Sequence, residues 1–266
     1  MLSLLERRIM MGGFLTRNRL RGAAWLLGLL CLAGLFLSPR AAAMTAEEII
    51  QRRDSNEYVQ TVIVEAEMVI LNNNRKLTKT MTSYADGDNA LTIFTNPRDR
   101  GTKFLKRGDE LWMFFPDAEE LVKISGHMLN QGMMGSDFSY QDIMESDKLT
   151  DLYEFQLVGE EELDGRQCYV LEGTAIPGEE VSYHRRKAWI DRERFVGLKE
   201  ELYARSGRLL KVMTTTKVEQ FEDRWYPVEA VMEDKLRKNT RTEFIVKSIE
   251  FNPVIPTETF TLENLR

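Results

Sequence analysis

Cysteine is almost absent from this chain of 266 residues, which contains only Cys31 and Cys168. Cys31 lies in an N-terminal segment that we expect to be removed, so Cys168 then has no partner for an intrachain disulfide. This scarcity excludes the small disulfide-stapled folds that are common among exported proteins. Burial of apolar side chains must therefore supply the stability, and residues 44–266 are long enough to do so as one domain.

The chain also lacks the common catalytic and nucleotide-binding motifs. It contains no G-x-S-x-G, H-E-x-x-H or C-x-x-C, no phosphate-binding glycine-rich loop and no G-x-G-x-x-G. There are two histidines, His127 and His184, and neither has a metal-ligand partner at a useful spacing. We therefore expect no enzyme, no metal site and no cofactor.

Basic residues are outnumbered, with 36 Lys and Arg against 42 Asp and Glu. Six of these basic residues and one of these acidic residues lie in residues 1–43, so the remainder carries a formal charge of -11. An acidic surface repels phosphate backbones and anionic membrane surfaces. We expect no nucleic-acid partner and no purely electrostatic attachment to a membrane.

Long apolar runs are limited to one near the N-terminus, residues 23–37. Three arginines at 17, 19 and 21 precede it, and Pro39 and three alanines at 41–43 follow it. This order predicts a secretory signal peptide, residues 1–43, cleaved after Ala43. The run of 15 residues is shorter than the ~20 needed to span a bilayer, which makes a retained anchor the weaker alternative. Leu30 before Cys31 argues against lipid attachment.

Helical periodicity is scarce in the remaining chain, whereas strand periodicity is abundant. A capping box at Thr45 and Glu48 predicts one amphipathic helix that ends near Asn56. Alternation of period two begins at residues 62–70 and recurs to residue 251, with turn signals such as Asp164-Gly165 between the segments. We predict a mainly β fold of about ten or eleven antiparallel strands. A sheet this long curls because its twist accumulates, so a barrel or half-barrel is expected, with the helices filling its mouth.

One long connection interrupts the strands, residues 126–147, and it is rich in methionine and aromatic residues. Ser139 and Asp142 form a variant capping box, after which Tyr140, Ile143 and Met144 share one face of a short helix. Two interpretations remain open. The segment is either a fixed plug of ordinary core residues or a movable lid over a ligand cavity, hinged at glycines.

An exported curved sheet with an apolar face and such a segment is suited to carrying a hydrophobic ligand through water. An acyl chain of ~15 methylenes loses about 12 kcal/mol on entering water, so it needs an apolar carrier. Period two alone does not determine which face points inward. The residues expected to bind lipid are Val64, Met68, Met113, Phe115, Leu198, Leu202, Val228 and Met232 on strands, and Met133, Met134, Phe138 and Tyr140 in residues 126–147.

Several stretches are distinctive: residues 135–143 (GSDFSYQDI), residues 111–116 (LWMFFP), Asn96-Pro97 before residues 101–105 (GTKFL), and the ending, residues 256–265 (PTETFTLENL). With them the chain resembles the outer-membrane lipoprotein-sorting protein family, the LolA-like group, over essentially all of residues 44–266. The resemblance implies an incomplete antiparallel β-barrel with a few helices packed in its concave face. It also implies a periplasmic location and binding of a lipid or an acylated lipoprotein, with no catalytic residue.

The resemblance further implies a partner and an alternative function. Members of this family work beside inner-membrane exporters of the resistance-nodulation-division type, so such an exporter is an expected partner of a monomeric carrier. The alternative is an envelope-stress sensor module that binds lipid-bearing ligands and restrains a membrane protein. Such regulators carry a second domain, and the sequence shows no composition break that would mark one. A hydrolase is the least favoured possibility.

Overall fold

The computed structural model describes residues 44–73, 75–145, 148–179 and 181–265. The expected signal peptide, residues 1–43, lies outside the described residues, as do residues 146 and 147 at the end of the methionine-rich connection. Within the described residues, no helix combines the length and apolar character needed to cross a membrane.

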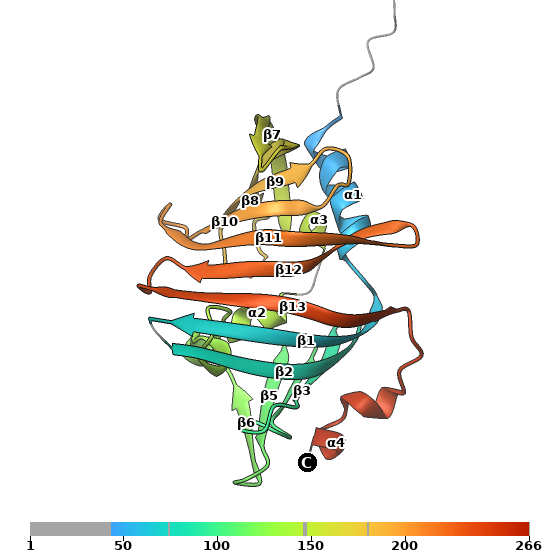
Figure 1. The fold of residues 1–266 in the computed structure, drawn as a ribbon, viewed down its shortest axis with the longest axis vertical. Helices are drawn as coiled ribbons and strands as arrows, with labels where there is room; N and C mark the ends of the chain where they lie inside the picture. The colour runs from blue at the N-terminus through green and yellow to red at the C-terminus, as the bar shows by residue number, and fades with distance from the viewer. Residues whose placement is uncertain (1–43, 74, 146–147, 180, 266) are drawn as a thin grey trace, which may run out of the picture. The chain divides into compact units, whose positions relative to one another are not determined.

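Thirteen antiparallel strands form one sheet in the described part of the chain (Figure 1). The strands are β1 (Thr61–Asn72), β2 (Arg75–Asp86), β3 (Asn89–Phe94), β4 (Lys103–Arg107), β5 (Glu110–Phe115), β6 (Glu120–Ile124), β7 (Tyr153–Leu163), β8 (Arg166–Ala175), β9 (Arg185–Asp191), β10 (Gly197–Tyr203), β11 (Leu209–Phe221), β12 (Arg224–Asp234) and β13 (Thr240–Phe251). Their order across the sheet is β6-β5-β4-β3-β2-β1-β13-β12-β11-β10-β9-β8-β7.

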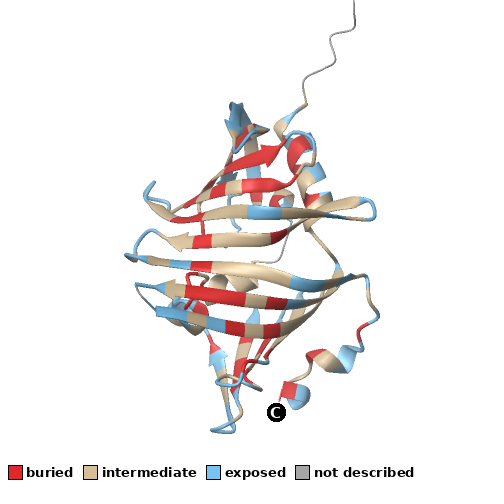
Figure 2. Cartoon of the chain, viewed as in Figure 1, coloured by how far each residue is buried: buried red, intermediate tan, exposed pale blue. Residues whose placement is uncertain are grey.

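The sheet is incomplete as a barrel because its first and last strands in this order, β6 and β7, do not pair within the described residues. The predicted half-barrel is therefore confirmed. The strand count of 13 is slightly higher than the predicted ten or eleven. Most residues of β7 are exposed, as expected of a strand at a sheet edge (Figure 2).

The hairpin turns follow the local sequence signals. Asp164 and Gly165 join β7 to β8 and have φ angles of 49° and 77°. Two positive φ angles are what a type I′ turn requires, and Asp-Gly is a preferred pair there. The predicted helix is α1 (Ala46–Glu57), and both halves of its capping box form between Thr45 and Glu48.

The two faces of the sheet carry different coverings. On one face, α1 and α3 (Leu149–Leu152) pack with residues of β7, β8 and β9, including Leu171 and Ile190. On the opposite face, the C-terminal η3 (Thr257–Phe260) and α4 (Leu262–Leu265) cover β3, β4 and β5. We call the first face, which α1 covers, the concave face. Cys168 is a free, buried thiol on the other face.

Candidate functional site

The connection between β6 and β7 lies on the concave face, and we call its residues 126–145 the plug. It contains η1 (Gly126–Asn130), η2 (Met133–Gly135) and α2 (Tyr140–Met144). The predicted capping box of α2 is confirmed. The Ser139 hydroxyl accepts a hydrogen bond from the backbone N–H of Asp142 at 3.2 Å. In return, the Asp142 carboxylate accepts one from the backbone N–H of Ser139 at 2.6 Å. The helix is only five residues long, so these caps stabilise a large part of it.

The apolar side of the plug packs on the inner residues of β1 to β5. Met133 is buried among residues such as Met68 and Phe104. The rings of Phe104 and Tyr140 lie 5.6 Å apart, and those of Phe138 and Phe244 lie 6.1 Å apart in an edge-to-face arrangement. Aromatic pairs in such geometries add about 0.5–1.5 kcal/mol to the burial of their apolar area.

The plug is also fixed to the sheet by a buried aspartate, Asp137. Its carboxylate accepts hydrogen bonds from Thr240 at 2.6 Å and Thr242 at 2.7 Å, both on β13. Arg237 donates to the carbonyl oxygen of Ser136 at 2.8 Å beside it. Because an unpaired buried carboxylate is costly, these partners hold this part of the plug in register with β13.

Two further carboxylates attach the end of the plug to the opposite half of the sheet. Asp142 accepts from Lys211 on β11 at 2.6 Å and from the Tyr183 hydroxyl at 2.5 Å. Glu145 pairs with Arg186 on β9 at 3.3 Å. The plug is thus joined by apolar contacts to one half of the sheet and by ion pairs to the other half.

A cavity of about 310 Å³ remains between the plug, α1 and the concave face. Its walls are mostly apolar, and the side chains that line them include Met81, Met133, Phe138, Val228, Phe244 and Val246. The volume lies at the lower end of the ~300–1,000 Å³ that is usual for small-molecule sites, and an apolar lining with few polar groups is typical of them. This cavity is the candidate site.

One end of the cavity is charged rather than apolar. Arg53 and Glu57 of α1 form an ion pair of 2.5 Å, and Glu200 of β10 lies 4.0 Å from the Arg53 guanidinium. Glu200 pairs on its other side with Arg186 at 2.9 Å. Burial opposes the charge of Arg186, yet its pKa is raised because Glu200, Tyr153 and Glu145 surround it. Burial raises the pKa of Glu57 above its ordinary value.

The twelve residues expected to bind lipid fall into several groups. Three of them line the cavity: Met133, Phe138 and Val228. Five pack beneath or within the plug instead: Val64, Met68, Met113, Met134 and Tyr140. Leu202 and Met232 are buried on strands that line the cavity, but their side chains do not line it, and Phe115 is exposed at a strand end.

Leu198, the last of the residues expected to bind lipid, does not lie on the concave face. The pairing of β9 with β10 shifts register between Gly197 and Lys199, which inserts Leu198 as an extra residue. A bulge of this kind turns the side chain to the other face, so Leu198 packs with Cys168 and Trp189.

Sequence reasoning also missed several lining residues, some of which had a detectable signal. Met81 and Phe244 lie in alternating strands and could have been found by extending the period-two pattern to β2 and β13. Arg53 and Glu57 follow the buried Ile49 at helical spacings of four and eight residues, which places them on the inner face of α1. Glu200 lies two residues before Leu202, so period two places it on the same face, although a carboxylate on a strand more often points to solvent.

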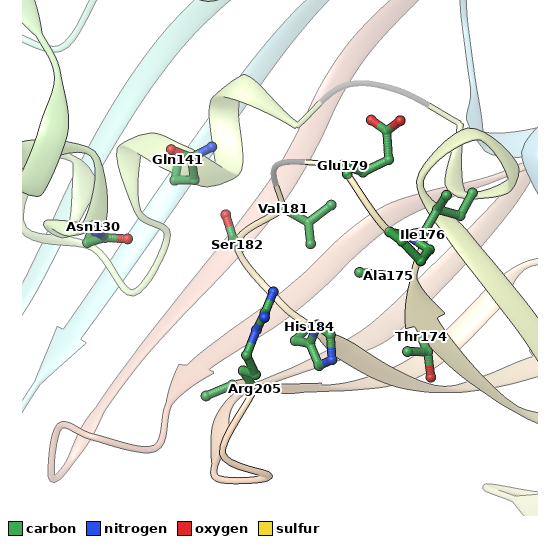
Figure 3. A pocket seen from close by; sticks show the side chains of 13 residues that line it. Asn130, Gln141, Thr174, Ala175, Ile176, Glu179, Val181, Ser182, His184 and Arg205 are labelled. Atoms are coloured by element: carbon green, nitrogen blue, oxygen red, sulfur yellow. The ribbon is translucent and has the colours of Figure 1, made fainter.

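A second, larger hollow of about 920 Å³ opens beside the plug (Figure 3). It lies between Gln141 and Asn130 of the plug, the segment that contains Ser182 and His184, and Arg205. Its lining is more polar than that of the cavity, so it suits an acyl chain poorly. In the described ranges, no group of three or more His, Cys, Asp or Glu side chains could hold a metal ion.

Comparisons with solved structures show the same fold in three bacterial proteins. A DUF1329 family protein from Desulfovibrio piger is 26% identical, with a TM-score of 0.75, and the match covers 82% of this chain and 97% of that one. An outer membrane lipoprotein-sorting protein domain from Vibrio parahaemolyticus is 27% identical, with a TM-score of 0.71 and coverage of 82% and 97%. A LolA superfamily protein from Nitrosomonas europaea is 25% identical, with a TM-score of 0.70 and coverage of 84% and 100%.

A protein-family model described as "Uncharacterized protein" matches residues 86–266, which is well over half of the chain. A comparison with proteins of curated function gives no match. The resemblance that the motifs indicated is confirmed by the family match and by these structures together. The chain belongs to the family that this model describes, and its structural neighbours are a DUF1329 family protein, a LolA superfamily protein and an outer-membrane lipoprotein-sorting protein domain.

Proposed function

We propose that this protein is a periplasmic carrier that binds an acyl chain, of a lipid or of a lipoprotein, in the cavity between the plug and the concave face. The observation that supports the proposal is a cavity of about 310 Å³ with mostly apolar walls, on the concave face of the sheet. Met81, Val228 and Phe244 line it from three different strands. Enclosing an acyl chain there removes it from water, at about 0.8 kcal/mol for each methylene.

The plug gives the cavity a means of adapting to a longer chain. Met133 and Phe138 contribute to the wall of the cavity and are themselves part of the plug. Methionine side chains repack at little cost, so a small displacement of the plug enlarges the 310 Å³ volume. With such a displacement, the carrier can hold an amphiphile that is larger than the 310 Å³ cavity.

Location and partners form the remaining parts of the proposal. The carrier acts in the periplasm, as a monomer, after cleavage following Ala43. It exchanges its cargo with an inner-membrane exporter of the resistance-nodulation-division type and moves the cargo between the two envelope membranes. The acidic charge of residues 44–266 fits a protein that docks on another protein and not on an anionic lipid surface.

Filling the cavity tests the carrier function. Ala230 lines the cavity, and Ala230→Phe places a ring in it without burying a charge. We expect mass spectrometry of organic extracts to detect lipid in the purified protein and at least about tenfold less in this variant, because lost contacts of 1.4 kcal/mol already give a factor of ten.

The matched control is Ala204→Phe, which introduces the same ring into the larger polar hollow. Lipid content is expected to be unchanged in this control. Lipid-free extracts of the unmodified protein, or equal lipid in Ala230→Phe with its fold retained, would contradict the carrier proposal. Loss of lipid only in Ala204→Phe would relocate the site to the polar hollow.

Processing is tested separately by intact-mass measurement on the periplasmic fraction. We expect a mass that begins at Met44, because the apolar run is short and an A-x-A site follows it. A mass that retains residues 1–43, or one that carries a diacylglyceryl group, would show instead that the protein is anchored.

A further inference from the structure

The charged end of the cavity contains a buried carboxylate oxygen that lacks a hydrogen-bond partner. Glu200 is 2% exposed and lines the cavity. One of its oxygens, Oε2, accepts from Arg186 at 2.9 Å. The other, Oε1, has no hydrogen-bond partner among the described residues, and the Arg53 guanidinium lies 4.0 Å from it.

An unmatched carboxylate oxygen at this depth is uncommon, because buried polar atoms almost always find a partner. Arg186 fixes the orientation of the carboxylate, so Oε1 cannot rotate away without losing that ion pair. A ligand in the cavity that carries a hydrogen-bond donor would satisfy Oε1. An entirely apolar ligand would leave it unmatched.

The charges around Glu200 limit what that donor can be. Arg53 and Arg186 lie on either side of its carboxylate, so an ammonium group would share the Glu200 charge with two other cations while losing its own hydration in this buried site. Glu57 and Asp54 both pair with Arg53, and Glu145 pairs with Arg186, so acidic groups outnumber the two arginines. A carboxylate or phosphate at this end would meet net repulsion.

We propose that the cavity selects an uncharged amphiphile whose polar end is a hydroxyl or amide, with that group donating a hydrogen bond to Glu200 Oε1. The inference rests on the proposed carrier function, since the chain of the same ligand occupies the apolar part of the cavity. Ligands with an anionic end, such as free fatty acids, are the ones that this arrangement rejects.

Three probes with the same chain test the selection: 1-dodecanol, dodecanoate and dodecylammonium, titrated by calorimetry at pH 8. We expect the alcohol to bind at least about tenfold more tightly than dodecanoate, which cannot donate the hydrogen bond, and also more tightly than dodecylammonium, which can donate it but must lose the hydration of its charge. Glu200→Gln keeps the shape and the bond to Arg186 but removes the charge, and it is expected to reduce the preference for alcohol over carboxylate to less than about threefold.

The matched control is Glu201→Gln, which makes the same change one residue further along β10, where the side chain pairs with Lys199 and Tyr203 instead. It is expected to leave the preference unchanged. Equal binding of the three probes, tighter binding of a charged probe, or equal effects of the two variants would overturn the inference and leave the carrier proposal standing. Failure of all three probes to bind would instead contradict the carrier proposal itself.

Discussion

Replacing Arg186 by methionine is expected to lower the free energy of unfolding by about 3–5 kcal/mol, the usual cost of removing one partner from a buried ion pair. Arg186 pairs with Glu200 at 2.9 Å and with Glu145 at 3.3 Å, and its guanidinium lies 4.8 Å from the centre of the Tyr153 ring. Methionine fills a similar volume, so the loss measures two buried carboxylates that lose this cation, of which Glu200 keeps only Arg53 at 4.0 Å. Urea unfolding monitored by circular dichroism gives the value.

The control for this prediction is Arg241→Met, which removes an exposed pair with Glu243 and is expected to cost less than about 1 kcal/mol. Adding Glu200→Gln to Arg186→Met is expected to restore part of the loss, because one of the two unpaired charges then disappears. A loss of less than about 1 kcal/mol for Arg186→Met would show that its carboxylate neighbours gain water or protons at little cost.

The fold was largely predictable because its determinants are local. Alternation in residues 62–70 reflects a strand with one buried face, and Asp164-Gly165 has the positive φ angles that its hairpin needs. The caps at Thr45 and Ser139 depend on residues three positions apart. Such signals can be read from a short window of sequence. The curling of the sheet follows from the twist of many strands together, whereas its incomplete closure was indicated by the family resemblance.

The site was only partly predictable because its determinants are not local. The bulge at Leu198 depends on how β9 and β10 align, and no residue in the sequence of β10 predicts it. The cavity exists where the plug meets α1 and β10 to β13, elements that are separated by more than 50 residues of sequence. Arg53, Glu200 and Arg186 read individually as ordinary surface charges, and only the fold brings them together inside.

Releasing the plug is the second change for which we expect a large effect. Asp137→Ala removes two hydrogen bonds from threonines to a carboxylate, at 2.6 Å and 2.7 Å, together with the ion pair between that carboxylate and Arg237 at 3.6 Å. Each hydrogen bond to a charged group contributes about 1.5–3 kcal/mol, so plug amides are expected to exchange at least about 100-fold faster. Hydrogen exchange followed by mass spectrometry resolves the plug from β1 and β13, whose rates are expected to change little.

Asp117→Ala, in the exposed turn between β5 and β6, is the control and is expected to leave exchange in the plug unchanged.

The same experiment on the unmodified protein decides between a lid and a fixed plug. A lid opens at a lower free energy than the sheet, and its amides become protected when 1-dodecanol is bound, because Met133 and Phe138 then contact the chain. If plug amides exchange as slowly as those of β1 and β13, with and without 1-dodecanol, the plug is fixed. Cargo must then reach the cavity by a route that does not displace the plug.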